Sequence, residues 1–146
     1  MTTQTARRPK RKPMSIVSQV KQEFRITYAD AVIPDMTDAQ WSEAERIRRL
    51  TWKSPHRLSL ANAAKCYGQM ATTYNEFHSG LLYDLKSAFG NDGIQVTPAR
   101  EYSVAVYLHI PDHDGLRQRV ESFVRERFNA DNVDWVDTET LRVWWD

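Results

Sequence analysis

The fold is decided by one stretch of the sequence, Tyr102-Ser103-Val104-Ala105-Val106-Tyr107-Leu108-His109-Ile110. Large apolar residues occupy every second position of this stretch, which is the period of a β-strand with one face in a core. The positions between them carry Ser103, Ala105, Tyr107 and His109. We therefore expect a strand over 102–110 with one buried face and a second face of mixed character.

The residues after this strand predict one helix and two more strands. The helix begins after Asp112 or Asp114, either of which can cap it, and its apolar stripe consists of Leu116, Val120, Phe123, Val124 and Phe128. Short apolar runs at Val133–Val136 and Leu141–Trp145 predict the two strands. This order of strand, helix, strand and strand resembles half of a ferredoxin-like α+β sandwich, and the resemblance is one of topology over 101–146.

The N-terminal half is expected to be helical. Apolar residues recur at helical spacing from Ser15 to Tyr28, with a strand over 24–28 as the alternative. Thr37 followed by Gln40 is a capping-box pattern that begins a second helix, and Pro55 ends that helix. We therefore expect an α+β protein with about three helices over 14–90 and a strand-helix-strand-strand unit over 101–146.

The third helix is predicted to be the longest, over Leu58–Phe89. Its apolar and small residues alternate spacings of three and four, as in a heptad seam, and they are Leu60, Ala64, Tyr67, Ala71, Tyr74, His78, Leu81, Leu85 and Ala88. One unbroken helix of this length would extend about 45 Å, which exceeds the diameter of a domain of this size. The helix therefore either breaks near Ser79 and Gly80 or projects toward a partner.

Composition and charge narrow the class of protein. The chain has 146 residues, of which 41% are hydrophobic and 27% charged, as in water-soluble globular proteins. No apolar run approaches the roughly 20 residues of a membrane-spanning helix, and the single cysteine, Cys66, fits a reducing compartment. We expect a cytoplasmic protein, or one inside a particle assembled in the cytoplasm, with no membrane partner.

Positive charge is concentrated in the first thirteen residues. This segment has no acidic residue and carries Arg7, Arg8, Lys10, Arg11 and Lys12. Of the 20 basic residues these five lie in the tail, so 15 remain against 19 acidic residues. We expect 1–13 to be a flexible tail that can contact phosphates, and 14–146 to form a single domain. Met14 is an alternative start, in which case the tail would be an extension.

Two further sets of residues suggest binding surfaces. Arg46, Arg49 and Lys53 recur at i, i+3 and i+7 of the predicted second helix, which gives either a phosphate-binding stripe or the solvated face of that helix. In the last strand, Trp144 shares a face with Arg142 while Trp145 points to the other face. A tryptophan beside an arginine is typical of protein interfaces, although a helix covering that face is an equal alternative.

No sequence motif indicates catalysis, a cofactor or a metal. His109, Asp112 and His113 are a dense set of potential ligands, but their spacing matches no established metal site. An enzyme would need these residues to converge with distant ones in a pocket, and we expect a non-enzymatic role.

The sequence thus predicts a binding or assembly subunit that acts beside nucleic acid. Its partners would be DNA or RNA, bound without sequence specificity, together with further copies of itself or a larger protein complex. The alternative is a structural component of a large assembly, for example a phage particle, whose basic arm docks on an acidic protein neighbour.

Overall fold

The computed structural model of the chain describes residues 14–29, 37–39, 52–69, 75–100 and 104–146. The helices described there are α1 (Ile16–Ala29), α3 (Leu60–Gln69), α4 (Gly80–Phe89) and α5 (Leu116–Arg127). The strands are β1 (Trp52–Lys53), β2 (Leu58–Ser59), β3 (Gln95–Arg100), β4 (Val104–His109), β5 (Asn132–Trp135) and β6 (Thr140–Trp145). All the strand pairs are antiparallel and belong to one sheet. The predicted α+β class is confirmed.

The sheet has the order β1-β3-β4-β6-β5, and β2 also pairs with β3. Because β6 lies between β4 and β5 and is antiparallel to both, β4 and β5 run parallel and α5 connects them. This is the split β-α-β arrangement of ferredoxin-like proteins, as the topology of 101–146 suggested. Two successive α-β-β units, α4-β3-β4 and α5-β5-β6, thus place their hairpins side by side.

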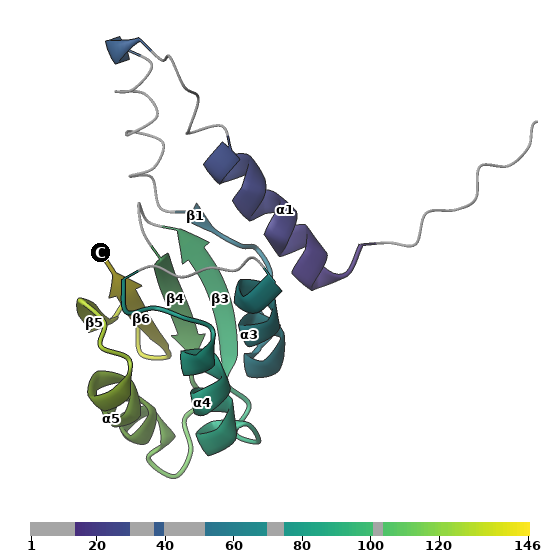
Figure 1. Cartoon of the computed structure of the whole chain (residues 1–146). Coiled ribbons are helices and arrows are strands. Elements are labelled where there is room, and N and C mark those ends of the chain that lie inside the picture. The colour runs from purple at the N-terminus through teal and green to yellow at the C-terminus, as the bar shows by residue number, and fades with distance from the viewer. Residues whose placement is uncertain (1–13, 30–36, 40–51, 70–74, 101–103) are drawn as a thin grey trace, which may run out of the picture.

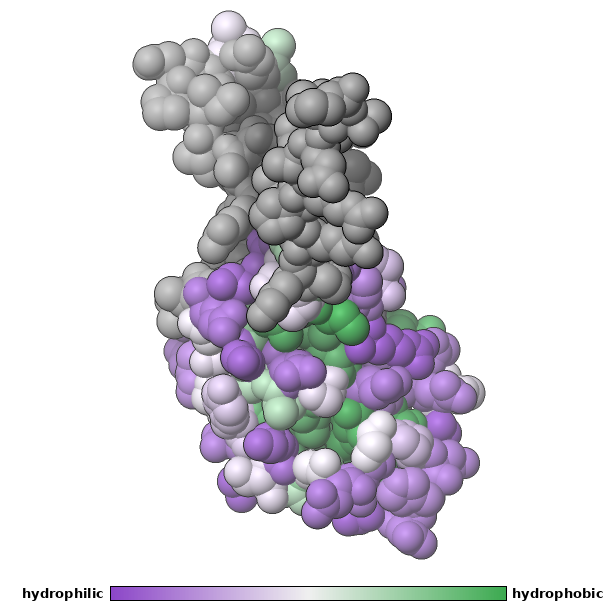
Figure 2. All heavy atoms as spheres, turned by 90° about the vertical axis from the view of Figure 1, so that its right-hand side faces the viewer, coloured by the Kyte–Doolittle hydropathy of each residue, from purple (hydrophilic) through white to green (hydrophobic). Residues whose placement is uncertain are grey.

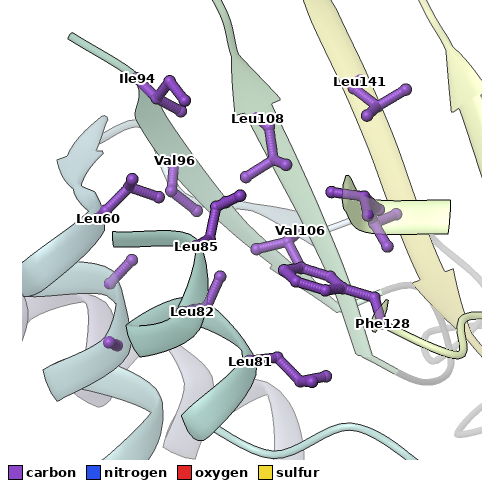
Figure 3. Packing of buried hydrophobic residues seen from close by; sticks show 14 of the residues in the cluster. Leu60, Leu81, Leu82, Leu85, Ile94, Val96, Val106, Leu108, Phe128 and Leu141 are labelled. Carbon is purple, nitrogen blue, oxygen red and sulfur yellow. The ribbon is translucent and has the colours of Figure 1, made fainter. Parts of the chain in front are cut away.

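Helices α3, α4 and α5 lie on one side of the sheet (Figure 1). The buried core lies between these helices and the sheet face that carries Val96, Val106, Leu108 and Val143. In the close-up, Leu82 and Leu85 of α4 lie close to β4 (Figure 3). The helices therefore cover the face of the sheet formed by the alternating apolar residues.

A series of aromatic rings runs through this core. Successive ring centroids lie 4.8–6.3 Å apart along the series Tyr67, Phe77, Trp145, Phe128, Phe123 and Phe89. Its polar atoms are satisfied, because Tyr67 Oη donates to Ala105 O at 3.1 Å and Trp145 Nε1 donates to Phe128 O at 3.1 Å. Trp145 is fully buried, as its predicted position on the core face of the last strand requires.

Helix α1 contacts the rest of the described structure through α3. Ser15 Oγ accepts a hydrogen bond from Ser18 N at 3.1 Å, which caps the helix N-terminus. Val20 is fully buried and Lys21 Nζ lies 3.5 Å from Gln69 Oε1 of α3. The first helix is therefore confirmed.

The prediction of one long helix over Leu58–Phe89 is wrong. Leu58 and Ser59 form strand β2, and Ser59 Oγ then accepts a hydrogen bond from Asn62 N at the start of α3. Phe77 is non-helical and only 1% exposed, and α4 begins at Gly80, where the sequence suggested a break. The heptad register fails as well, because His78 and Ala88 are exposed.

Strand β3 was not predicted, since Pro98 lies in its middle. Ser54 N donates to Pro98 O at 3.0 Å, so the backbone of Pro98 faces β1 and not β4. The strand that pairs with β3 changes at this point. Lys53 of β1 lies opposite Ala99, Leu58 of β2 lies opposite Val96, and residues 54–57 between β1 and β2 loop out. The missing N–H of proline therefore lies where the neighbouring strand is interrupted, and it removes no hydrogen bond to β4.

Two further expectations need correction. The residue before α5 is Gly115, with φ +67° and no side-chain cap, so neither Asp112 nor Asp114 caps this helix. Lys53 does not continue the second helix but lies in strand β1. Residues 38–39 are helical, while the rest of the predicted second helix lies outside the described residues.

The surface of the described part is mainly polar. Figure 2 shows hydrophilic residues around a smaller hydrophobic area on one side of the body. Large hydrophobic side chains that are exposed are Met14, Ile16, Tyr83 and Val136. None of the helices in the described ranges combines the length and the apolar character that crossing a bilayer requires.

Candidate nucleic-acid interface

The second face of the sheet, opposite α3, α4 and α5, has a different character from the core face. Strand register places Lys53, Ala99, Ala105 and Trp144 in one cross-strand row of this face. The adjacent row contains Thr97, Tyr107, Arg142 and Asp134, and the third contains Gln95, His109 and Thr140. Small residues thus lie at the centre of the first row, with aromatic and charged residues around them.

Two cations of this face lie over aromatic rings. Lys53 Nζ is 4.0 Å from the centroid of the Tyr107 ring, and Arg142 Cζ is 5.5 Å from a Trp144 ring. These distances fall within the range of cation–π attraction, which contributes about 0.5–1 kcal/mol at exposed sites. Lys53 and Tyr107 belong to different strands, whereas Arg142 and Trp144 belong to the same strand. All four residues lie on the second face of the sheet, so both cations lie above this face.

Accessibility differs among these residues. Ala99, Ala105 and Tyr107 are buried, whereas Trp144 and Arg142 are half-buried and Lys53 is exposed. Tyr107 therefore supports the Lys53 ammonium and has little surface of its own. The groups of these rows that a ligand can reach include the Lys53 ammonium, parts of the Arg142 and Trp144 side chains, and the exposed Gln95 and Asp134.

His109 lies at the edge of this face, and hydrogen bonds hold its ring in a fixed position. Its Nε2 lies 2.6 Å from Thr97 Oγ1 and its Nδ1 lies 3.2 Å from Thr140 Oγ1. Burial lowers the pKa of His109 and the positive charge of Arg57 lowers it further, while Asp137 and Glu139 oppose the shift. The ring is therefore held in its neutral form at neutral pH, with both nitrogens engaged by hydroxyl groups.

A pocket of about 240 Å³ opens beside His109. Two guanidinium groups, from Arg57 and Arg117, and two carboxylates, from Asp112 and Glu139, contribute to its lining. Arg117 is held by a 3.0 Å hydrogen bond from its Nε to Ile110 O and lies 3.7 Å from Asp112. Because the charges balance, the pocket favours neither an anion nor a cation.

The three potential ligands that the sequence places close together, His109, Asp112 and His113, do not all converge, although His109 and Asp112 both line this pocket. His109 bonds to the two threonines, whereas His113 Nε2 lies 3.3 Å from Asp92 O on the surface. Within the described ranges, no group of three or more histidine, cysteine or acidic side chains is arranged to hold a metal ion.

The structure describes only part of the predicted binding set. Lys53, Arg142 and Trp144 are described and lie on one face, although the sequence placed Lys53 on a helix and assigned the other two to a separate protein interface. Outside the described residues lie Arg7, Arg8, Lys10, Arg11, Lys12, Arg46 and Arg49.

Sequence reasoning missed Tyr107 as a member of this surface. The sequence did contain the information needed to place Tyr107. It alternates with the apolar residues of the strand and must therefore lie on the second face. What the sequence did not reveal was strand β1, which brings Lys53 over the Tyr107 ring.

Comparison of the chain with protein families, with curated proteins and with solved structures finds no match.

Proposed function

We propose that the chain is a non-enzymatic subunit that binds nucleic acid across the second face of its sheet, assisted by the basic tail. The observation that carries this proposal is the placement of Lys53 and Arg142 over aromatic rings of one sheet face, with the helices packed on the other. Sheets that carry aromatic residues beside cations are a common platform for single-stranded nucleic acid.

Each accessible group has a role in this proposal. The Lys53 ammonium contacts a phosphate, and Tyr107 fixes its position from below. The Trp144 ring offers a partly exposed surface on which a base can stack, and Arg142 lies over a ring of the same side chain. Asp134 lies opposite Arg142 in the register of β5 and β6 and is exposed. Its negative charge repels phosphate, so it opposes phosphate binding on this face.

The basic tail adds contacts without sequence preference. Its five cations, and Arg46 and Arg49, would neutralise phosphates and release counterions, which makes affinity fall as salt rises. DNA and RNA are both compatible with such contacts. The tail and the sheet face would then each contribute to the salt dependence of the affinity for nucleic acid, and variants of one would leave the contribution of the other unchanged.

The test is fluorescence anisotropy of a labelled single-stranded oligonucleotide at several salt concentrations. Lys53→Gln is expected to weaken binding and to reduce the salt slope by about one, whereas Asp134→Asn is expected to strengthen binding. Matched controls lie on α4, which covers the opposite face, where Lys86→Gln and Asp84→Asn make the same charge changes at exposed positions. If the control variants change affinity as much as the sheet-face variants, the proposed surface is wrong.

A second candidate function is that of a structural component in a large assembly, whose basic arm docks on an acidic protein. The half-buried Trp144 beside Arg142 favours it, since such pairs are frequent in protein interfaces. Replacing the five tail cations with glutamine separates the two functions. Nucleic-acid binding predicts a loss of oligonucleotide affinity, whereas the structural role predicts no oligonucleotide affinity in either protein.

A further inference from the structure

A groove of about 440 Å³ lies between the end of α4 and the outer face of α5. Phe89 and Phe123 line it, with their ring centroids 5.5 Å apart, and of the two Phe123 is half-buried while Phe89 is buried. Arg119 Cζ lies 6.0 Å from the Phe89 ring and Arg127 Cζ lies 4.7 Å from the Phe123 ring. The groove therefore combines aromatic surface with two guanidinium groups.

The charge of this groove is positive. Glu126 is the acidic residue of its lining, against the two arginines. Arg119, Glu126 and Arg127 are all exposed, and no ion pair between Glu126 and either arginine is present in the described structure. A complementary occupant needs an apolar side chain for the aromatic surface and carboxylates for the arginines.

The turn between β5 and β6 has these properties. Val136 is 48% exposed, one of the few large hydrophobic side chains at the described surface with this exposure. Two exposed acidic residues of the turn follow it in sequence, namely Asp137 and Glu139. An apolar side chain followed by carboxylates is thus presented to solvent.

The turn is also held in one conformation. Asp137 Oδ1 accepts hydrogen bonds from Glu139 N at 2.8 Å and from Thr140 N at 2.7 Å, and Val136 N donates to Thr140 O at 3.0 Å. Ile110 N also donates to Glu139 O at 2.8 Å, which ties the turn to the end of β4. Little conformational entropy is therefore lost when this turn binds.

We propose that the chain associates with itself head to tail, with the β5–β6 turn of one copy entering the α4–α5 groove of the next. Val136 packs on the half-buried Phe123 ring, and the carboxylates of Asp137 and Glu139 pair with Arg119 and Arg127. The groove lining and the turn have no residue in common, so one copy can offer both surfaces at once. Such a heterologous contact builds a ring or a filament and not a closed two-fold dimer.

The groove is formed by α4 and α5, which cover the opposite side of the sheet from the face proposed for nucleic acid. Association is therefore measured on the full chain without nucleic acid, as molar mass by light scattering over a range of protein concentrations. Wild-type mass is expected to rise with concentration and to fall as salt rises, because the paired charges are exposed. A wild-type protein that stays monomeric at every concentration overturns the proposal.

Two variants remove the two halves of the contact. Val136→Asp alters the turn, and the double variant Arg119→Glu with Arg127→Glu alters the groove. Each alone is expected to remain monomeric. An equimolar mixture is expected to form a complex of two chains, because the intact groove of the first fits the intact turn of the second and no further copy can add.

Controls keep this test independent of folding. All three substituted positions are exposed, and circular dichroism checks that each variant is folded. Lys86→Glu with Lys65→Glu makes the same charge change as the groove variant on exposed positions of α4 and α3, and it is expected to associate like wild type. If the variants associate like wild type, or if the folded variants fail to pair when mixed, the proposed contact is wrong.

Discussion

The role of Phe77 gives the sharpest prediction about the fold. In the heptad pattern read from the sequence, Phe77 lies outside the apolar seam, so its removal would cost little. In the structure it is 1% exposed, and its ring lies 5.0 Å from Tyr67 and 4.8 Å from Trp145. It therefore connects α3 to the last strand through the centre of the core.

The cost of Phe77→Ala follows from these contacts. Truncation of a buried phenylalanine typically costs about 3–5 kcal/mol, and the loss of two aromatic contacts places this site toward the upper end of that range. With a urea m-value of about 1.5 kcal/mol per M, the unfolding midpoint would fall by roughly 2–3 M. Such a loss is a large part of the about 5–15 kcal/mol that stabilises a typical domain.

Urea unfolding followed by tryptophan fluorescence measures this loss. Tyr83→Ala on α4 is the matched control, because Tyr83 is 46% exposed and its truncation should cost less than about 1 kcal/mol. Phe77→Leu, expected to cost about 1–2 kcal/mol, keeps the test readable if the alanine variant is largely unfolded. Equal midpoints for Phe77→Leu and Tyr83→Ala would refute the packing described for this segment.

Three other predictions concern titration, reactivity and a buried hydrogen bond. Because the pKa of His109 is lowered below its ordinary value of 6.5, its contribution to stability is complete above pH 6.5 and is lost as the pH falls through the folded pKa. His109→Gln should therefore flatten the dependence of stability on pH below 6.5, measured by urea unfolding at several pH values. An unchanged pH dependence would count against the lowered pKa. Burial raises the pKa of the Cys66 thiol to about 11, so iodoacetamide at pH 8 should label it only after unfolding, and rapid labelling of the native protein would contradict its buried position. Trp145→Phe removes the donor to Phe128 O and should cost about 1–3 kcal/mol in thermal or urea unfolding, where a stability equal to wild type would show that this bond contributes nothing.

Strands with regular alternation could be predicted from the sequence, whereas strands that depend on distant pairing could not. In β4 and β6, large apolar residues occupy every second of six positions, and both strands were predicted from this pattern. β3 was hidden because Pro98 normally excludes a strand interior, and only the interruption of its neighbour makes this proline harmless. β1 and β2 have two residues each, too few for any periodic signal.

The long helix was predicted wrongly for a related reason. Apolar spacing of three and four residues persists from Leu60 to Ala88, but periodicity does not show where a helix ends. Phe77 is buried between two helices because its ring packs on Tyr67 of α3 and on Trp145, and Trp145 lies far away in the sequence. The same limit applies to the candidate interface, where Lys53 joins Tyr107 and Trp144 only through strand pairing.

Photo-crosslinking tests the central proposal most directly. The full-length protein would be irradiated in the presence of a bromouridine-substituted single-stranded oligonucleotide, and the crosslinked peptides identified by mass spectrometry. Binding across the second face of the sheet predicts a crosslink at Trp144 that is weakened in Lys53→Gln and retained in Lys86→Gln. Crosslinks confined to aromatic residues away from this face, such as Tyr83 on α4, or the absence of any crosslink, would contradict it.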